Sequence, residues 1–323
     1  MSRPDIVVLS EHLSEAASAW LAERCELLER PHDHPNFHQA LTDAAALVVR
    51  TYTIVNETLL EAAPRLRVVG RAGAGLDNID LAACERRGIQ VVYTPEANTQ
   101  AVVEYVLWLL GDALRPRIAL PGPVDREQWR RLRAETVGRH QISDLTLGIL
   151  GLGRIGRRLA EVAAAIGMEV RYHDLIEMQP EQPFGAEPVP VESLFAECHV
   201  VSVHIDGRPA NRRFVGSRLI ERMRPDVIFV NTSRGFVVDG AALAGFLRRN
   251  PGALALLDVH DREPFGGDDP LVGVPNARLY PHLAGRTTSA MSAMSWVVRD
   301  VVEVLAGRPP RYPAPAPPPK EPL

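Results

Sequence analysis

Three short motifs in the second half of the chain each place one ionisable side chain after an apolar run. In chain order they are NTSRG (Asn231–Gly235), DVHDREP (Asp258–Pro264) and PHLAG (Pro281–Gly285), which supply Arg234, Glu263 and His282. A guanidinium binds a carboxylate through a planar fork, and an imidazole exchanges a proton near neutral pH. A carboxylate beside the imidazole fixes its tautomer and stabilises its protonated form. The motifs predict proton transfer on a small substrate that carries a carboxylate, with these three side chains as the catalytic set.

A glycine-rich motif, GLGRIG, lies upstream and predicts a dinucleotide site. Gly151 permits a tight turn after an apolar run, Gly153 lets a pyrophosphate approach the backbone, and Gly156 lets helix and strand pack closely. The pyrophosphate would bind at the helix N-terminus, where free N–H groups and the helix dipole favour an anion. The residues predicted to contact it are Gly151, Gly153, Arg154, Ile155 and Gly156.

Asp174 ends the next predicted strand, at the spacing where a carboxylate accepts hydrogen bonds from both ribose hydroxyls. A 2′-phosphate would be repelled there, and no arginine directly follows Asp174 to receive one. NAD is therefore expected rather than NADP. A hydride carrier, an arginine for a carboxylate and a histidine for a proton together predict the interconversion of a 2-hydroxy acid and its 2-oxo acid.

At these residues the chain resembles the D-2-hydroxyacid dehydrogenase family, and most closely its phosphoglycerate dehydrogenase branch, here without a regulatory domain. The resemblance implies that Thr232 and Asp258 line the nicotinamide pocket, with Asp258 bonded to the carboxamide. It also implies that His204 opens a cofactor-lining segment. In the family the sequence of this segment is usually H-x-P-L-T, whereas this chain has HIDGRP, with Asp206 in place of the proline. Glu263 argues against the formate dehydrogenase branch, which carries an amide at this position.

The resemblance also predicts a substrate loop, GRAGAGLDNID (Gly70–Asp80), whose N–H groups at Ala72, Gly73, Ala74 and Gly75 would receive an anion. Three arginines match phosphate-contacting positions of phosphoglycerate dehydrogenases: Arg50, Arg71 and Arg131. They predict a substrate with a second anion, such as 3-phosphoglycerate or the phosphonate pair phosphonopyruvate and phosphonolactate. The alternative is that they reflect an arginine-rich composition, because Lys320 is the sole lysine among 36 basic residues. Arg286 is an additional cation near His282 whose role the sequence leaves open.

Alternating apolar runs and amphipathic segments predict the α/β fold class, with two doubly wound parallel sheets. The strands expected in the first are Ile6–Leu9, Ala46–Arg50, Leu66–Gly70 and Ile89–Val92, with helices at Ser14–Arg24, Glu57–Ala63 and Asn78–Arg87. A long helix is expected at Thr99–Leu114. The strands expected in the second are Leu145–Leu150, Met168–Tyr172, Val200–His204, Val227–Asn231, Leu254–Asp258 and Arg278–Tyr280.

The family resemblance predicts a discontinuous, flavodoxin-like substrate domain (1–97 and 286–308) into which a Rossmann NAD-binding domain (98–285) is inserted. A helix over Thr287–Leu305 would cross back to complete the first domain. The proline-rich tail, 309–323, is expected to be solvated and polyproline-like. The resemblance further implies a homodimer that packs through the Thr99–Leu114 region.

Composition excludes several other classes of protein. The formal net charge of −4 argues against a nucleic-acid partner, which needs a concentrated basic surface. No apolar stretch is of membrane-spanning length, and no signal peptide is expected. The three scattered cysteines predict free thiols in the reducing cytoplasm. The HDHPNFH segment lacks the acid or thiol ligands of a metal site, so no metal is expected.

Two alternatives remain open at this point. A hydroxypyruvate or glyoxylate reductase would use the same catalytic set on a substrate with one anion. An NAD-sensing corepressor that binds peptides would use the same fold without rapid turnover.

Overall fold

The computed structural model describes residues 4–115, 117–138, 140–176 and 185–316. They form two compact units. Unit 1 comprises the chain up to Asn98 together with the segment from Gly285 onward, and unit 2 is the inserted segment Thr99–Ala284. Each unit has its own parallel sheet and its own apolar core.

The sheet of unit 1 has five parallel strands in the order β2-β1-β3-β4-β5. The strands are β1 (Ile6–Leu9), β2 (Glu26–Glu29), β3 (Ala46–Val49), β4 (Val68–Arg71) and β5 (Gln90–Tyr93). This is the flavodoxin-like order of a doubly wound sheet, as predicted. The described helices that follow these strands are α1 (Glu15–Ala22), α2 (Phe37–Leu41), α3 (Glu57–Glu61) and α4 (Leu81–Arg86).

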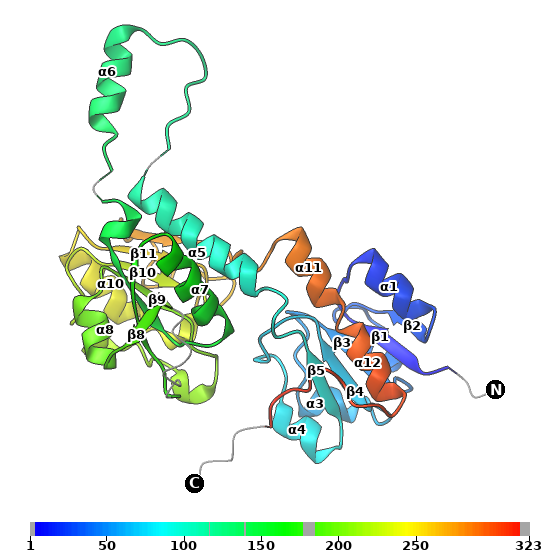
Figure 1. Cartoon of the computed structure of the whole chain (residues 1–323). Helices are drawn as coiled ribbons and strands as arrows, with labels where there is room; N and C mark the ends of the chain where they lie inside the picture. Colours follow the sequence, from blue (N-terminus) through cyan, green and yellow to red (C-terminus); the bar gives the residue numbers. More distant parts are fainter. Residues whose placement is uncertain (1–3, 116, 139, 177–184, 317–323) are drawn as a thin grey trace. The chain divides into compact units, whose positions relative to one another are not determined.

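The C-terminal segment packs on unit 1 as two helices, whereas the sequence predicted one. They are α11 (Thr288–Ser295) and α12 (Val298–Leu305). Helix α12 packs on β3, β4 and β5, where the orange and red end of the chain covers blue and cyan strands (Figure 1). Its buried Val298 and Val301 share one core cluster with residues of β1, β3 and β4.

The prediction of a wholly solvated tail was wrong for residues 311–314. Tyr93 N–H donates to the Tyr312 carbonyl and Ala314 N–H donates to the Val91 carbonyl, so this segment pairs antiparallel with β5, the edge strand. The buried Asp300 carboxylate accepts the N–H groups of Arg311 and Tyr312. Proline is tolerated beside an edge strand because its missing N–H need not enter the ladder. Residues 317–323, with Lys320, lie outside the described part of the chain.

The sheet of unit 2 has seven parallel strands in the order β12-β11-β10-β9-β6-β7-β8. This confirms the predicted Rossmann topology, in which the strand order reverses beside the first strand, β6. The strands are β6 (Thr146–Leu150), β7 (Glu169–His173), β8 (Ala186–Pro188), β9 (Val200–Val203), β10 (Ile228–Asn231), β11 (Leu254–Leu257) and β12 (Ala277–Leu279).

The helices of unit 2 begin with α5 (Thr99–Leu114), at the predicted bounds. The others described are α6 (Arg126–Glu135), α7 (Arg154–Ala165), α8 (Val191–Glu197), α9 (Ser217–Ile220) and α10 (Gly240–Arg249). Helix α7 runs between β6 and β7 and packs on both strands and on α5. Among the described residues, no helix combines the length and the apolar character needed to cross a membrane.

Candidate active site

The side chains of Glu263 and His282 form a hydrogen-bonded pair. The distance between Glu263 Oε2 and His282 Nδ1 is 2.7 Å. The second carboxylate oxygen, Oε1, accepts the N–H of His260 at 3.0 Å. Because Nδ1 is engaged, Nε2 is the nitrogen of His282 that can meet a substrate, and this side chain is 46% exposed. The predicted acid–base pair is thus assembled in the structure.

The environment keeps Glu263 ionised. Burial alone would raise its pKa, but the hydrogen bonds from His282 and from the His260 N–H outweigh burial and hold the pKa below its ordinary value. A carboxylate that stays charged fixes the Nδ1–H tautomer of the imidazole and stabilises the protonated ring. The contribution of this charge to stability is present above the ordinary pKa of glutamate, about 4.3. It is lost only as the pH falls through the lower pKa of the folded state.

Asp258 fixes the backbone at His282. The side chain of Asp258 is fully buried, and its two oxygens accept the N–H groups of Leu283 and Ala284, each at 2.8 Å. The N–H of His282 donates to the Asp258 carbonyl. His282 has φ of 54°, which L residues adopt at a cost of about 1–3 kcal/mol, so a turn held at three points is needed to keep it there.

Tyr105 on α5 lies near the same Asp258 carboxylate, and burial followed by the charge of Asp258 raises the pKa of Tyr105. Burial likewise raises the pKa of Asp258 despite its hydrogen bonds. The long helix α5 therefore brings a tyrosine next to the carboxylate that holds the histidine loop. Sequence reasoning missed Tyr105, because a single tyrosine on an apolar helix gives no signal of its distant partner.

The NTSRG motif forms a turn closed by Asn231. Its Oδ1 accepts both the N–H and the hydroxyl of Ser233, and its Nδ2 donates to the carbonyl of Arg234. The Nη1 of Arg234 donates to the Ser233 carbonyl at 2.7 Å. The turn places Arg234 immediately after the carboxyl end of β10, the edge where parallel α/β sheets bind ligands.

Gly235 brings the first two motifs into backbone contact. A Cβ on this residue would lie 1.9 Å from the carbonyl carbon of His260 and 2.2 Å from its oxygen. Any side chain here would therefore force apart the segments that carry Arg234 and Glu263. His260, which sequence reasoning did not single out, is buried at this contact, and its Nε2 lies 2.8 Å from the Tyr280 carbonyl.

The glycine-rich motif has the geometry of a nucleotide-binding turn. Gly151 has φ of 96°, and a Cβ on Gly156 would lie 2.1 Å from the Gly151 carbonyl oxygen, so α7 packs closely on the turn. By contrast, a Cβ on Gly153 would meet no described atom within 4 Å. The Leu152 N–H donates to Asp174 Oδ2 at 2.6 Å, which ties the turn to the end of β7. This leaves open space in front of the N-terminus of α7, where a pyrophosphate would bind.

Residues 107–284 match the sequence model of the family described as D-isomer specific 2-hydroxyacid dehydrogenase, NAD binding domain. The chain belongs to this family. The matched segment contains the glycine turn, Arg234, Glu263 and His282, so the family's NAD-binding domain and the geometry above coincide.

Similar proteins in the family differ in their named substrates. The chain is 33% identical to the D-3-phosphoglycerate dehydrogenase of Archaeoglobus fulgidus, over 82% of this chain and 50% of that protein, so it spans half the length of that relative. It is 34% identical to the glyoxylate reductase of Aeropyrum pernix, over 93% of this chain and 92% of that protein. It is 33% identical to the (S)-sulfolactate dehydrogenase of Chromohalobacter salexigens, over 93% of this chain and 98% of that protein. Among solved structures, a glyoxylate reductase from Paecilomyes thermophila superposes with a TM-score of 0.82 at 26% identity, over 97% of this chain and 99% of that one.

The cofactor of the family fits the residues present. Gly153 leaves space at the start of α7, which begins with Arg154 and Ile155. The hydroxyl of Thr232 is buried without a hydrogen-bond partner among the described residues, as expected of a group that meets a ligand. Asp174 accepts the N–H groups of Leu152 and Ile176 and keeps lone pairs for ribose hydroxyls. The individual contacts of Thr232, Asp174 and Asp258 with NAD stay predictions.

His204 follows β9 beside the glycine turn. A Cβ on Gly151 would lie 2.8 Å from the His204 carbonyl carbon, so the two backbones touch. The Nε2 of His204 lies 2.8 Å from the Ser202 hydroxyl, and burial lowers the pKa of this histidine to about 4. The imidazole is therefore neutral near pH 7, and its placement supports a packing role against the turn.

In unit 1, Arg50 directly follows β3, and Arg71 is the last residue of the neighbouring strand β4. The two arginines lie at the same sheet edge, because Val49 of β3 pairs with Arg71. Arg50 is buried, and its guanidinium donates to the His12 carbonyl at 3.2 Å and to Met291 Sδ at 2.9 Å. Burial lowers the pKa of Arg50. The nearby Glu11 opposes this shift and the nearby Arg286 adds to it.

Glu11 does not take up the guanidinium of Arg50. Its carboxylate accepts the four backbone N–H groups of residues 50–53 and the Thr53 hydroxyl. Among the described residues, neither Arg50 nor Arg286 has a carboxylate within ion-pair distance. Unit 1 thus carries a buried guanidinium with neutral hydrogen-bond partners, beside a second cation.

The substrate loop offers fewer N–H groups than predicted. Ala72 N–H donates to the Val49 carbonyl and Gly73 N–H donates to the Arg71 carbonyl. The expectation of a run of available N–H groups was therefore wrong for Ala72 and Gly73, whereas those of Ala74 and Gly75 have no acceptor among the described residues. Arg71 lies over this loop, since a Cβ on Gly73 would fall 1.2 Å from Arg71 Nη1.

Arg131 lies in unit 2, on α6, and its side chain is exposed. No residue of α6 is buried, so within one chain no packing fixes the position of this arginine. The structure therefore places Arg50 and Arg71 on one sheet edge and gives Arg131 no shared element with them.

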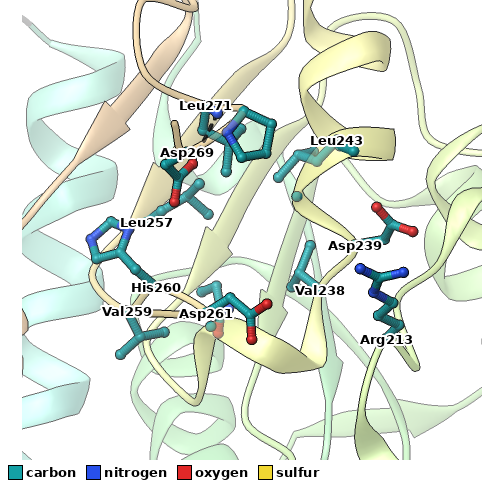
Figure 2. Close-up of a pocket in the computed structure, with 15 residues that line it drawn as sticks. Arg213, Val238, Asp239, Leu243, Leu257, Val259, His260, Asp261, Asp269 and Leu271 are labelled. Atoms are coloured by element: carbon teal, nitrogen blue, oxygen red, sulfur yellow. Dashed lines mark hydrogen bonds between the residues drawn. The ribbon is translucent and has the colours of Figure 1, made fainter. Parts of the chain in front are cut away.

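Figure 2 shows a pocket in unit 2 that is lined by residues of the NTSRG and DVHDREP motifs and of the α10 region. Its lining includes Asp239 and Leu243 from the start of α10, and His260 and Asp261 from DVHDREP. Arg234, Glu263 and His282 are not among its lining residues. This pocket is therefore not the place where the sequence predicts the chemistry.

Replacing Glu263 with Gln is expected to lower kcat for oxo-acid reduction by about 10²-fold. The amide no longer stabilises the protonated imidazole, so the alkaline limb of the pH profile moves to lower pH. The measurement is kcat from pH 5 to 9, with Glu221→Gln, an exposed glutamate paired with Arg249, as the control. An unchanged alkaline limb would show that Glu263 does not act through His282.

Proposed function

We propose that the protein is an NAD-dependent D-2-hydroxyacid dehydrogenase that interconverts a small 2-hydroxy acid and its 2-oxo acid. The observation that carries this proposal is the Glu263–His282 pair, located with Arg234 beyond the carboxyl ends of β10, β11 and β12 in the NAD-binding domain. NADH, when bound, supplies the hydride that reduces C2 of the oxo acid.

The protein residues provide the remaining requirements of the reaction. Arg234 binds the carboxylate of the substrate and orients its carbonyl. His282 donates a proton from Nε2 to the carbonyl oxygen as the alcohol forms, and Glu263 stabilises the ring while it is protonated. In the oxidation direction, the neutral ring accepts the proton of the alcohol. The reaction thus needs a protonated histidine for reduction and a neutral one for oxidation.

The preferred substrate carries a second anion, which Arg50 and Arg71 bind. Three observations support this. Within the described part of the chain, the guanidinium of Arg50 is buried and bonded only to neutral acceptors. Arg286 adds a second positive charge beside it, and Arg71 lies over the substrate loop. A relative that covers nearly the same length is named for sulfolactate, which bears a sulfonate besides its carboxylate. A phosphonate, phosphate or sulfonate at C3 would offer the oxygens that such forks bind.

The second candidate is a glyoxylate or hydroxypyruvate reductase. It is favoured by the glyoxylate reductase of Aeropyrum pernix, which matches along 92% of its own length. In that case Arg50 and Arg71 stabilise the fold and the substrate has one anion.

Paired oxo acids distinguish these candidates. We expect kcat/KM for NADH-dependent reduction of phosphonopyruvate, 3-phosphohydroxypyruvate or sulfopyruvate to exceed that for glyoxylate, hydroxypyruvate and pyruvate. Replacing Arg71 with Gln should raise KM for the preferred dianion about 10- to 100-fold. The reason is that a hydrogen bond to a charged group contributes ~1.5–3 kcal/mol to binding. It should leave KM for glyoxylate unchanged.

Arg65→Gln is the matched control for this variant, because Arg65 is an exposed arginine of the same unit, paired with Asp43. A preference for glyoxylate that Arg71→Gln does not alter would establish the reductase instead. Slow turnover of every oxo acid together with normal NADH binding would favour a corepressor-like binding protein.

We also propose a homodimer and a cytoplasmic location. Trp108 on α5 is 53% exposed and Trp129 on α6 is 48% exposed, which is costly for large aromatic side chains unless a partner covers them. Cys84 and Cys198 are buried free thiols, which suits a reducing compartment. A monomer in sedimentation at micromolar concentration would contradict the dimer.

A further inference from the structure

The segment after β9 carries a charged pair at the nucleotide-binding edge of unit 2. Leu150 of β6 pairs with His173 of β7 on one side and with Val203 of β9 on the other. The residues that follow these positions, Asp174, Gly151 and His204, therefore stand abreast at the carboxyl edge. With strands about 4.8 Å apart, Asp174 and the start of the β9 loop are separated by roughly 10 Å. The side chain of an arginine can span much of this distance.

Asp206 and Arg208 form a bidentate ion pair in this loop. The Nε of Arg208 donates to Asp206 Oδ1 at 2.7 Å, and Nη2 donates to Oδ2. The Arg208 N–H also donates to Oδ1 at 3.2 Å. The fork that an arginine presents to a carboxylate or phosphate is therefore already occupied.

Asn211 anchors this pair to the fold. Its side chain is buried, and its Nδ2 donates to both the carbonyl and Oδ1 of Asp206, each at 2.9 Å. Ile205 in the same loop packs on the glycine turn, because a Cβ on Gly151 would lie 2.9 Å from Ile205 Cγ2. The pair is thus held by a buried amide and not only by two exposed side chains.

Arg208 is also close enough to Asp174 to respond to its charge. The hydrogen bonds that Arg208 donates to Asp206 chiefly raise the pKa of Arg208, and the charge of Asp174 contributes in the same direction. Among the described residues, this edge of unit 2 thus carries the carboxylates of Asp174 and Asp206 together with the guanidinium of Arg208, whose fork is engaged. Such a site repels a 2′-phosphate, which needs both positive charge and a fork.

We propose that Asp206 is a determinant of cofactor choice, which selects NAD over NADP by occupying the fork of Arg208. Asp174 would bind the ribose hydroxyls, and Asp206 engages the guanidinium of Arg208, which would otherwise be available to a 2′-phosphate. This role depends on the residues by which the chain departs from the family's usual segment. It concerns nucleotide affinity, which is measured without turnover, so it can fail independently of the proposed substrate.

The test is titration of the purified full-length protein with NADH and with NADPH, measuring both dissociation constants by nucleotide fluorescence. In Asp206→Asn the neutral amide keeps the size of the side chain and its contact with Asn211, but loses the charge that engages Arg208. We expect NADPH to bind at least tenfold more tightly than to the unaltered protein, and NADH to bind within about threefold of its original affinity. The gain for NADPH should disappear in Asp206→Asn/Arg208→Ala.

Glu221→Gln is the matched control, because it removes the same charge from another exposed arginine–carboxylate pair of unit 2. Its ratio of NADPH to NADH affinity should not change. Unchanged NADPH affinity in Asp206→Asn would overturn the proposal. So would equal weakening of both nucleotides in Asp206→Asn and Asp206→Ala, because that result would assign Asp206 to loop structure alone.

Discussion

Replacing His282 with Asn should lower kcat for oxo-acid reduction by about 10³-fold, because the proton of the carbonyl oxygen loses its donor. Asparagine is the informative substitution here. His282 has φ of 54°, and asparagine adopts this left-handed conformation more readily than most residues, so the turn held by Asp258 should persist. Its amide can also donate to Glu263.

The dissociation constant for NADH should be unchanged in His282→Asn, because the glycine turn and Asp174 are untouched. Steady-state reduction of the preferred oxo acid and a separate NADH titration provide the two measurements. His38→Asn is the control, since His38 is exposed on α2 of unit 1. A fall in kcat of less than tenfold would show that another group or water supplies the proton.

Replacing Arg234 with Lys should lower kcat/KM by about 10³-fold, an effect comparable with the loss of a donor that stabilises charge in a transition state. Lysine keeps the positive charge but lacks the planar fork that orients a carboxylate. We expect KM to rise and kcat to fall together, because the carboxylate is bound in both the ground state and the transition state. Gly235 and Asn231 still define the turn in this variant.

Arg249→Lys provides the comparison for Arg234→Lys, because Arg249 is an exposed arginine on α10 that pairs with Glu221. It should retain normal kinetic constants. If Arg234→Lys changed KM alone, Arg234 would act only in binding. If it changed neither constant, the carboxylate of the substrate would be bound elsewhere.

The Glu263–His282 pair could be predicted because both are ionisable residues that follow the ends of predicted strands. Apolar runs identify β10, β11 and β12, and parallel strands bring their carboxyl ends to one edge, so the side chains that follow must gather there. The same apolar runs located the buried strands of both sheets, whereas the order of the strands was predicted from the family resemblance. Buried central strands carry continuous apolar runs, which are the strongest signal in an α/β sequence.

The missed elements lack such a signal. Strand β2 is ELLE at a sheet edge and β8 contains proline, while α6 has no buried face to impose an apolar period. The edge pairing of residues 311–314 was missed for a related reason. It depends on the free edge of β5 and on the buried Asp300, neither of which marks the tail itself.

The sequence by itself determined the class of fold, the glycine turn and the identity of Arg234, Glu263 and His282, because local patterns and residue chemistry carry that information. Tertiary structure decided what holds these groups. The buried Asp258 fixes the turn at His282, and His260 meets Gly235 backbone to backbone. These contacts join residues from different elements, and their energies depend on burial and geometry that exist only after the chain has folded.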